Sequence, residues 1–347
     1  MALRGSTGGL LAVHAHPDDE TLSTGGLLAA WARSGRPVTL VTCTRGEQGD
    51  VIPAELAYLE GDARALGAHR EHELADALRA LGVTDHHFLD QLADPTAPGG
   101  AHGPASPAVA YCDSGMVWET AGRAGRVAEL PEAAFVAVPV DDAARRLVAL
   151  IRARRPVVVV TYEPGGGYGH PDHVHAHRVT MRAVELAASE GTRVAPGPGG
   201  AVGALPPFRV PLVLWAAQPE ETIRSALLAL PHLSWVEALR QADPRLVVRD
   251  PTGPLLSIAV PHSQLDYVVD TSGVGSDVVD ALRSHLTQVH AIGVASPATV
   301  VGAAITGCFA LSNHVVLPLY DREWYRVATT WRPGAVANLL PLTPQVS

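Results

Sequence analysis

Two short segments of this 347-residue chain combine histidine with aspartate: HPDD at residues 16–19 and HPDH at residues 170–173. Imidazole nitrogen and carboxylate oxygen are both zinc ligands, and a catalytic zinc site typically takes three protein ligands and leaves a position for water. His16 and Asp19 can reach one metal from the first segment, and His173 can complete the set from the second. Because zinc lowers the pKa of a water that it binds towards about 7, Asp18 beside the ligands is a candidate general base. Together the two segments predict a hydrolytic metal site.

Each segment also has a simpler interpretation. Proline and aspartate favour the first turn of a helix, so one HPDD sequence alone more often marks a helix start. Two such segments, each following an apolar run typical of a buried strand, favour the metal site. The glycine-rich residues 165–169 are either a flexible connector or a loop that lets a substrate approach, with Tyr168 as a donor to developing negative charge. A phosphate-binding loop is not indicated, because neither GxGxxG nor GxxxxGK follows the first apolar run.

Apolar runs alternate with helix-like patterns in the first half of the chain. The predicted strands and helices, in two groups, are Leu10–His14, Pro37–Thr44, His87–Leu89 and Pro156–Tyr162, and Leu22–Arg33, Glu60–Leu81, Asp141–Arg154 and His173–Ser189. Continuous apolar strands in such an alternation predict an α/β fold whose mostly parallel sheet is covered by helices on both faces. Ligands of such sheets bind beyond the carboxyl ends of the strands. Both histidine segments follow a predicted strand and are expected at that edge.

A stretch rich in proline and glycine, Ala195–Pro207, divides the chain. We predict a catalytic core with the metal site at residues 1–190, and a smaller C-terminal α+β segment at residues 191–347 that shapes the substrate pocket. The elements predicted in this second part are strands at Val210–Ala216, Leu246–Val248, Leu256–Val260 and Val315–Tyr320 and a helix at Ser276–Gln288. Within the core, Ala93–Pro107 is typical of a long loop, and loops of this length are often functional.

The composition excludes several classes of protein. With 47% hydrophobic and 18% charged residues, the chain is expected to be globular with a sizeable core. The net charge of −9 and the absence of a basic run argue against a nucleic-acid partner. All 26 basic residues are arginine, which excludes lysine as a nucleophile or Schiff base.

The cysteines and the apolar runs bear on location. Cys43, Cys112 and Cys308 are widely separated, which favours a reducing compartment over a disulfide framework or a thiolate zinc site. No signal peptide is indicated, because the first apolar run stops at His14. No apolar stretch approaches the roughly 20 residues that span a bilayer, so a cytoplasmic protein without membrane association is expected. The oligomeric state is left open.

Five longer strings carry a resemblance to a known family. They are VHAHPDDETLSTGG at residues 13–26, VTCTRGEQGDVI at 41–52, DSGM at 113–116, TYEPGGGYGHPDHVHAH at 161–177 and ALSN at 310–313. In these strings the chain resembles the LmbE/PIG-L superfamily of zinc-dependent N-acetylglucosaminyl deacetylases. Within that superfamily it is most similar to the mycothiol-pathway enzymes that act on N-acetylglucosaminyl-inositol.

The resemblance implies a Rossmann-like core and a division of roles at the site. One Zn²⁺ per chain would be held by His16, Asp19 and His173, with Asp18 as general base; Fe²⁺ remains an alternative, since the same donors suit both metals. The oxyanion would be stabilised by His170 and Tyr168, with His170 also protonating the leaving amine. Asp172 would tune His170, as carboxylates next to a site often do.

The same resemblance implies which residues meet the substrate, a small amino sugar. Arg70, Asp113 and Asp50 would supply polar groups, and Met116 would pack against the sugar. His285, in HLTQ, resembles a C-terminal signature near the family's site, but a core or helix-capping role is the alternative. His14 shares a strand face with His16 and is either a neighbour of the site or a buried structural histidine.

The implied reaction is hydrolysis of a linear amide, the N-acetyl group of 1-(2-acetamido-2-deoxy-glucopyranosyl)-myo-inositol, to glucosaminyl-inositol and acetate. The alternatives are a mycothiol S-conjugate amidase or another sugar N-deacetylase. The amidase is disfavoured because Leu22-Ser23-Thr24 resembles the deacetylase and the chain lacks the lysine expected there in the amidase. From a different class, a non-catalytic metal-binding or nucleotide-binding protein is disfavoured by the retained catalytic side chains and by the missing glycine fingerprint.

Overall fold

The centre of the fold is one twisted sheet with the strand order β14-β9-β13-β7-β6-β1-β2-β3, and β8 beside β7. The computed structural model describes residues 8–94, 110–120, 123–191, 205–295, 305–328 and 341–345. The strands of this central sheet are β1 Leu10–His14, β2 Val38–Thr42, β3 Asp85–Phe88, β6 Val158–Thr161, β7 Leu212–Pro219, β8 Ala259–Val260, β9 Tyr267–Asp270, β13 Arg322–Val327 and β14 Leu342–Pro344. The pairs from β3 through β8 are parallel, whereas β13, β9 and β14 add antiparallel pairs at one edge. The predicted α/β fold with a mostly parallel sheet is confirmed.

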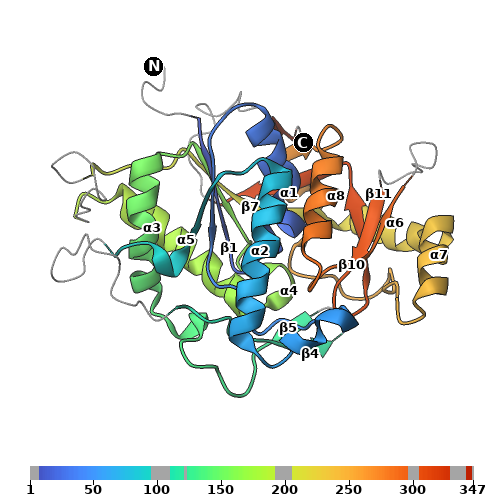
Figure 1. The fold of residues 1–347 in the computed structure, drawn as a ribbon. Coiled ribbons are helices and arrows are strands. Elements are labelled where there is room, and N and C mark those ends of the chain that lie inside the picture. The colour runs from blue at the N-terminus through green and yellow to red at the C-terminus, as the bar shows by residue number, and fades with distance from the viewer. Residues whose placement is uncertain are drawn as a thin grey trace.

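Helices cover both faces of this sheet (Figure 1). One face packs against α1, α2 and α8, and the other packs against α3 and α5. These helices are α1 Asp19–Arg33, α2 Ala63–Leu81, α3 Val140–Arg154, α5 Pro171–Ala188 and α8 Gly275–Ser284. Alternate residues of β1 serve the two cores, because Leu10 and Ala12 face the first and Leu11 and Val13 the second. A continuous apolar run follows from this double burial.

A second, smaller layer is formed by the C-terminal part. It contains a three-stranded antiparallel sheet and two helices, of which the second packs with the sheet around a separate apolar cluster that includes Leu230, Val236 and Cys308. The elements are α6 Glu220–Ala229, α7 Ser234–Ala242, β10 His290–Val294, β11 Ile305–Ala310 and β12 Val316–Tyr320. The expected strand at Leu246–Val248 is wrong, since only Val247 pairs, in an isolated bridge to Val315.

The predicted boundary at residue 190 falls between β6 and β7, which are neighbouring strands of the same sheet. The C-terminal segment therefore extends the central sheet as well as building the smaller one, and the division into two parts stays a prediction. The expected loops Ala93–Pro107 and Ala195–Pro207 lie largely outside the described residues. In the described part of the chain, no helix is both long and apolar enough to cross a membrane.

The chain order reverses at β1. From β1 the chain proceeds through β2 to β3 on one side, and later returns to β6 and β7 on the other side. Such a switch point leaves a crevice at the carboxyl ends of the two strands, where α/β sheets bind their ligands. HPDD follows β1 directly, and HPDH follows β6, so the topology brings the two segments together.

Candidate metal and catalytic site

The turn between β1 and α1 places Asp18 in an unusual backbone conformation. Its φ is 110° and its ψ is −36°, a region that residues with a side chain rarely adopt. Strain of this kind costs about 1–3 kcal/mol and persists where the surroundings enforce it. Here Glu20 enforces it, because its Oε2 accepts the Asp18 N–H at 2.9 Å. The strained turn directs the Asp18 carboxylate into the crevice instead of capping α1, for which no side-chain hydrogen bond is made.

His16 lies among three buried carboxylates. Its Nε2 is 3.2 Å from Asp172 Oδ2 and 3.5 Å from Asp113 Oδ1, and its Nδ1 is 3.3 Å from Asp19 Oδ2. Burial lowers the pKa of His16, but the carboxylates of Asp113, Asp172 and Asp19 outweigh burial and raise it well above the usual value. When Nε2 donates to Asp172, the Nδ1 lone pair of the neutral ring faces Asp19.

His173 has a similarly defined tautomer. Its Nδ1 lies 3.1 Å from the carbonyl oxygen of Gly166 and donates to it. The Nε2 lone pair then points towards Asp19 Oδ1 at 3.2 Å, and Nε2 is buried without a hydrogen-bond partner among the described residues. Tyr162 stacks on the ring with centroids 4.3 Å apart, which holds its orientation. A buried, unpaired imidazole nitrogen beside a carboxylate is what a metal ligand requires before the ion binds.

The donor set fits a metal ion. Ligand atoms of His16, His170 and His173 lie within 4.8 Å of one another, and Asp19 contacts two of these rings. Buried carboxylates need compensating positive charge, and three of them converge on one histidine here. Nitrogen and oxygen donors in this arrangement suit zinc. The residues predicted as ligands are therefore brought together, although the clustered imidazoles also include His170.

Asp18 is held from behind by Arg70 of α2. The Arg70 Nη2 lies 3.1 Å from Asp18 Oδ2, and its Nη1 donates to the carbonyl oxygen of Gly46 at 2.7 Å. A Cβ at Gly46 would come within 2.0 Å of this guanidinium, so glycine is required for the approach. Burial raises the pKa of Asp18 to about 7 although Arg70 opposes the shift. Arg70 is 2% exposed, its Nη atoms bond to Asp18, Gly46 and Pro17, and its buried Nε has no hydrogen-bond partner among the described residues. Arg70 therefore positions Asp18, and its expected contact with the sugar stays a prediction.

His170 and Tyr168 present donors to the same space. The His170 Nδ1 accepts the backbone N–H of Asp172 at 3.1 Å, so the proton of the neutral ring sits on Nε2. Burial, His16 and His173 lower the pKa of His170 well below its usual value and keep it neutral. Burial raises the pKa of Tyr168, which therefore remains a hydroxyl donor. The Tyr168 ring lies 5.0 Å from that of His173 and 6.0 Å from that of His170.

The remaining predicted residues lie at different distances from this cluster. The Asp172 carboxylate accepts from His16 and from both the N–H and hydroxyl of Ser114, and the Asp172 backbone N–H donates to His170. Its expected tuning of His170 stays a prediction. Asp113 is buried next to His16. Asp50 is exposed and Met116 is half-buried.

Two further histidines belong to the core. The His14 Nε2 bonds to Thr24 at 2.9 Å, and burial lowers the pKa of His14 to about 4. His285 follows α8 as its C-terminal cap, and its Nε2 donates to Glu20 Oε1 at 2.8 Å. Glu20 therefore links His285 to the strained Asp18 backbone. Sequence reasoning missed Glu20 and Ser114, although both lie within or beside the motifs AHPDDE and DSGM.

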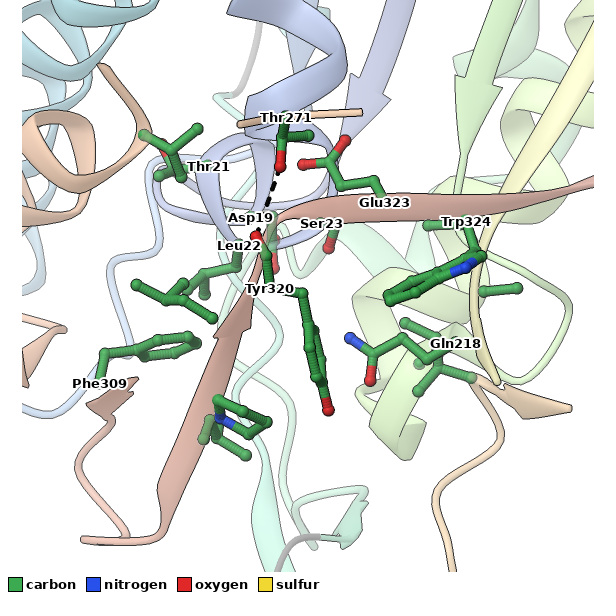
Figure 2. A pocket seen from close by; sticks show the side chains of 18 of the residues that line it. Asp19, Thr21, Leu22, Ser23, Gln218, Thr271, Phe309, Tyr320, Glu323 and Trp324 are labelled. Atoms are coloured by element: carbon green, nitrogen blue, oxygen red, sulfur yellow. Dashed lines mark hydrogen bonds between the residues drawn. The ribbon is translucent and has the colours of Figure 1, made fainter. Parts of the chain in front are cut away.

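A cavity of about 230 Å³ opens beside Asp19, Tyr168 and His173. Figure 2 shows the rings of Phe309, Tyr320 and Trp324 around this hollow. Most of its walls come from β7, α8, β11, β12 and β13, all in the C-terminal half of the chain. The metal cluster therefore faces a partly apolar chamber.

Comparison with known proteins identifies the family. Residues 11–184 match the family described as PIG-L: GlcNAc-PI de-N-acetylase. The chain belongs to this family. The motif resemblance is thus confirmed, and the matched residues include both histidine segments.

Relatives of this PIG-L chain extend the similarity to most of its length. It is 43% identical over 318 residues to the 1D-myo-inositol 2-acetamido-2-deoxy-alpha-D-glucopyranoside deacetylase of Kineococcus radiotolerans, covering 92% of this chain and 76% of the relative. The enzyme of the same name from Streptomyces avermitilis is 39% identical, with 92% and 91% covered. A solved structure, the N,N'-diacetylchitobiose deacetylase of Pyrococcus horikoshii, matches with a TM-score of 0.46 and 17% identity over 81% of this chain and 70% of that chain.

Proposed function

We propose that this PIG-L hydrolase removes the N-acetyl group from 1-(2-acetamido-2-deoxy-glucopyranosyl)-myo-inositol, giving glucosaminyl-inositol and acetate for mycothiol biosynthesis. Relatives at 36–43% identity over at least 92% of this chain carry the name of this deacetylase. The observation in the structure that carries the proposal is the pair of fixed imidazoles, His16 and His173, each of which turns one ring nitrogen towards Asp19. Asp18 lies next to this arrangement, and its carboxylate is not needed as a metal ligand.

We assign Zn²⁺ to His16, Asp19 and His173. When bound there, zinc polarises the amide carbonyl and makes water acidic enough to be deprotonated near neutral pH. Asp18 takes the water's proton, and Arg70 keeps its carboxylate oriented. Four carboxylates are buried at the site, and His16 lies between three of them. Because buried carboxylates need compensating positive charge, we expect a divalent cation here instead of one more proton on an imidazole ring.

We assign the developing oxyanion to two donors, the Nε2–H of His170 and the hydroxyl of Tyr168. Both groups are neutral donors in this burial, which suits them to a negative charge that appears only as the carbonyl is attacked. Asp18, which has taken the water's proton, can pass it to the leaving amine; the expected protonation by His170 would require a protonated imidazole, whereas its lowered pKa keeps the ring neutral. Asp172 contributes by orienting His16, through which it acts on the metal ligands.

We assign the sugar to the rim of the crevice beside Asp113, with Asp50 and Met116 as further contacts. The segment 191–347 shapes the pocket, since most of the cavity wall lies in it. The three free cysteines agree with a reducing, cytoplasmic setting for this reaction.

A substrate comparison tests the proposal. Metal-replete enzyme is offered N-acetylglucosaminyl-inositol and, separately, a mycothiol S-conjugate, and the free amine released is quantified. A higher kcat/KM for the N-acetyl sugar is expected, whereas preference for the conjugate would make the chain an amidase. Metal content is measured in parallel for His16→Ala and His173→Ala, with His262→Ala on an exposed turn as the control. Both ligand variants should lose catalytic zinc, and unchanged metal content in both would refute the assigned site.

A further inference from the structure

A second group of metal-binding side chains lies away from the crevice. Asp243 caps the C-terminal end of α7, His290 opens β10, and His314 lies in the turn between β11 and β12. Their ligand atoms all lie within 4.8 Å of one another, and all three residues are half-buried. The two imidazole rings stand nearly perpendicular at 83° with centroids 5.1 Å apart, so that their edges can converge on one point. The elements that carry them, α7 and β10, lie side by side at one end of the molecule (Figure 1).

The hydrogen bonds of the two histidines leave nitrogen lone pairs free. His290 Nε2 donates to the carbonyl oxygen of Leu311 at 3.1 Å, so the neutral ring keeps its lone pair on Nδ1. His314 Nδ1 is buried and has no hydrogen-bond partner among the described residues. A buried imidazole nitrogen without a partner is unfavourable unless something occupies it. One ligand atom from each ring and one from Asp243 lie close enough together for a single metal ion to bind them.

The third donor is available at low cost. Both carboxylate oxygens of Asp243 accept from Arg245, at 2.8 Å from Nε and 2.9 Å from Nη2. This bidentate ion pair is at the surface, with the Arg245 side chain 67% exposed, so solvent screens it. A divalent cation held by two imidazoles can therefore recruit one carboxylate oxygen and leave the other to Arg245.

We propose that Asp243, His290 and His314 form a second metal site for a borderline divalent cation of the zinc type. Two imidazoles and one carboxylate are donors that zinc accepts, with metal–ligand distances of about 2.0–2.2 Å. The ligand atoms must then contract to about 3.3 Å from one another, a small movement for side chains at a helix end and in a turn. The site joins α7 to the three-stranded sheet across the apolar cluster around Val236 and Cys308. Its role is to brace the C-terminal layer, and it does not depend on the reaction in the crevice.

The test counts metal and maps it to residues. Protein stripped with a chelator is titrated with Zn²⁺ against a chromophoric competitor, and bound zinc is counted by mass spectrometry. The unchanged chain should bind two equivalents per chain. His290→Ala and His314→Asn should each bind one, with at least a hundredfold rise in the Kd of the lost equivalent, because ligand loss exceeds the 10–100-fold effect of a neighbouring residue. Amide hydrolysis should persist in both, and His262→Ala should still bind two equivalents.

Asparagine at position 314 guards against misfolding, since the φ of 57° there is one that asparagine tolerates. The double variant His16→Ala/His173→Ala provides an independent measurement, because its single remaining equivalent should disappear when His314→Asn is added. One equivalent in the unchanged chain, two equivalents retained by His314→Asn, or no zinc in the double variant would each overturn the proposal.

Discussion

The strained turn at Asp18 predicts that two substitutions that both abolish activity differ in their effect on stability. At a φ of 110°, a residue with a Cβ carries about 1–3 kcal/mol of strain. Glycine avoids this strain, but loses about 0.5–1 kcal/mol more than alanine in conformational entropy on folding. Asp18→Gly should therefore be more stable than Asp18→Ala by about 1 kcal/mol, and both should be inactive because the base is gone. The comparison is matched, since both variants lose the same carboxylate and the same contact to Arg70.

Urea unfolding of the two metal-free variants measures the difference directly, and thermal melting gives a second reading. A difference of 1 kcal/mol raises the melting temperature by about 2 °C in a chain of this size. Far-ultraviolet circular dichroism of the folded states checks that neither variant has rearranged. If Asp18→Ala proves as stable as Asp18→Gly, the backbone strain is not real. If Asp18→Gly retains full hydrolysis, Asp18 is not the base.

Three further predictions concern other parts of the molecule. Arg152→Met should lower the free energy of unfolding by about 3 kcal/mol, because the buried guanidinium donates to several carbonyl oxygens at the end of α5. Urea unfolding measures this change, and an unchanged transition would contradict the prediction. Burial raises the pKa of Asp85, but hydrogen bonds from Arg154 and Thr39 outweigh burial and hold it at about 2. This depressed pKa contributes stability that is complete above about pH 4 and is lost as the pH falls towards 2. The free energy of unfolding of Asp85→Asn should therefore depend less steeply on pH over that window. The difference should be less than about 1 kcal/mol, because the ion pair is partly exposed. Tyr168→Phe should lower kcat by about 10²–10³-fold with KM little changed, and steady-state kinetics showing a normal kcat would remove Tyr168 from the oxyanion role.

The central sheet was predictable because its strands are buried on both faces. Leu10–His14 and Pro156–Tyr162 are continuous apolar runs, and such runs mark parallel strands between two helical layers. Their order in the chain placed the two histidine segments at one edge. The motifs thus located the site before any contact was known.

The C-terminal layer was harder to predict because its strands are short and half-buried. β10 and β12 show no regular alternation of buried and exposed residues, so their periodicity is weak, and α7 is only nine residues long. Residue spacing also says nothing about which distant side chain returns to the site. Arg70 is expected at the sugar from the motifs alone, whereas its contact with Asp18 follows only from the packing of α2 against the turn.

The cavity has a consequence for how this enzyme could change. The groups assigned to bond cleavage stand in and beside the turns that follow β1 and β6, within residues 11–184, whereas most of the chamber wall is built from later strands and α8. Substitutions at wall positions such as Phe309 or Trp324 can reshape the space without touching the metal ligands. The metal ligands and most of this wall are thus encoded in separate stretches of one gene, whereas the sugar contacts assigned to Asp113, Asp50 and Met116 lie in the same stretch as the ligands. For engineering, a library should randomise the wall positions and leave the segments HPDD and HPDH unchanged.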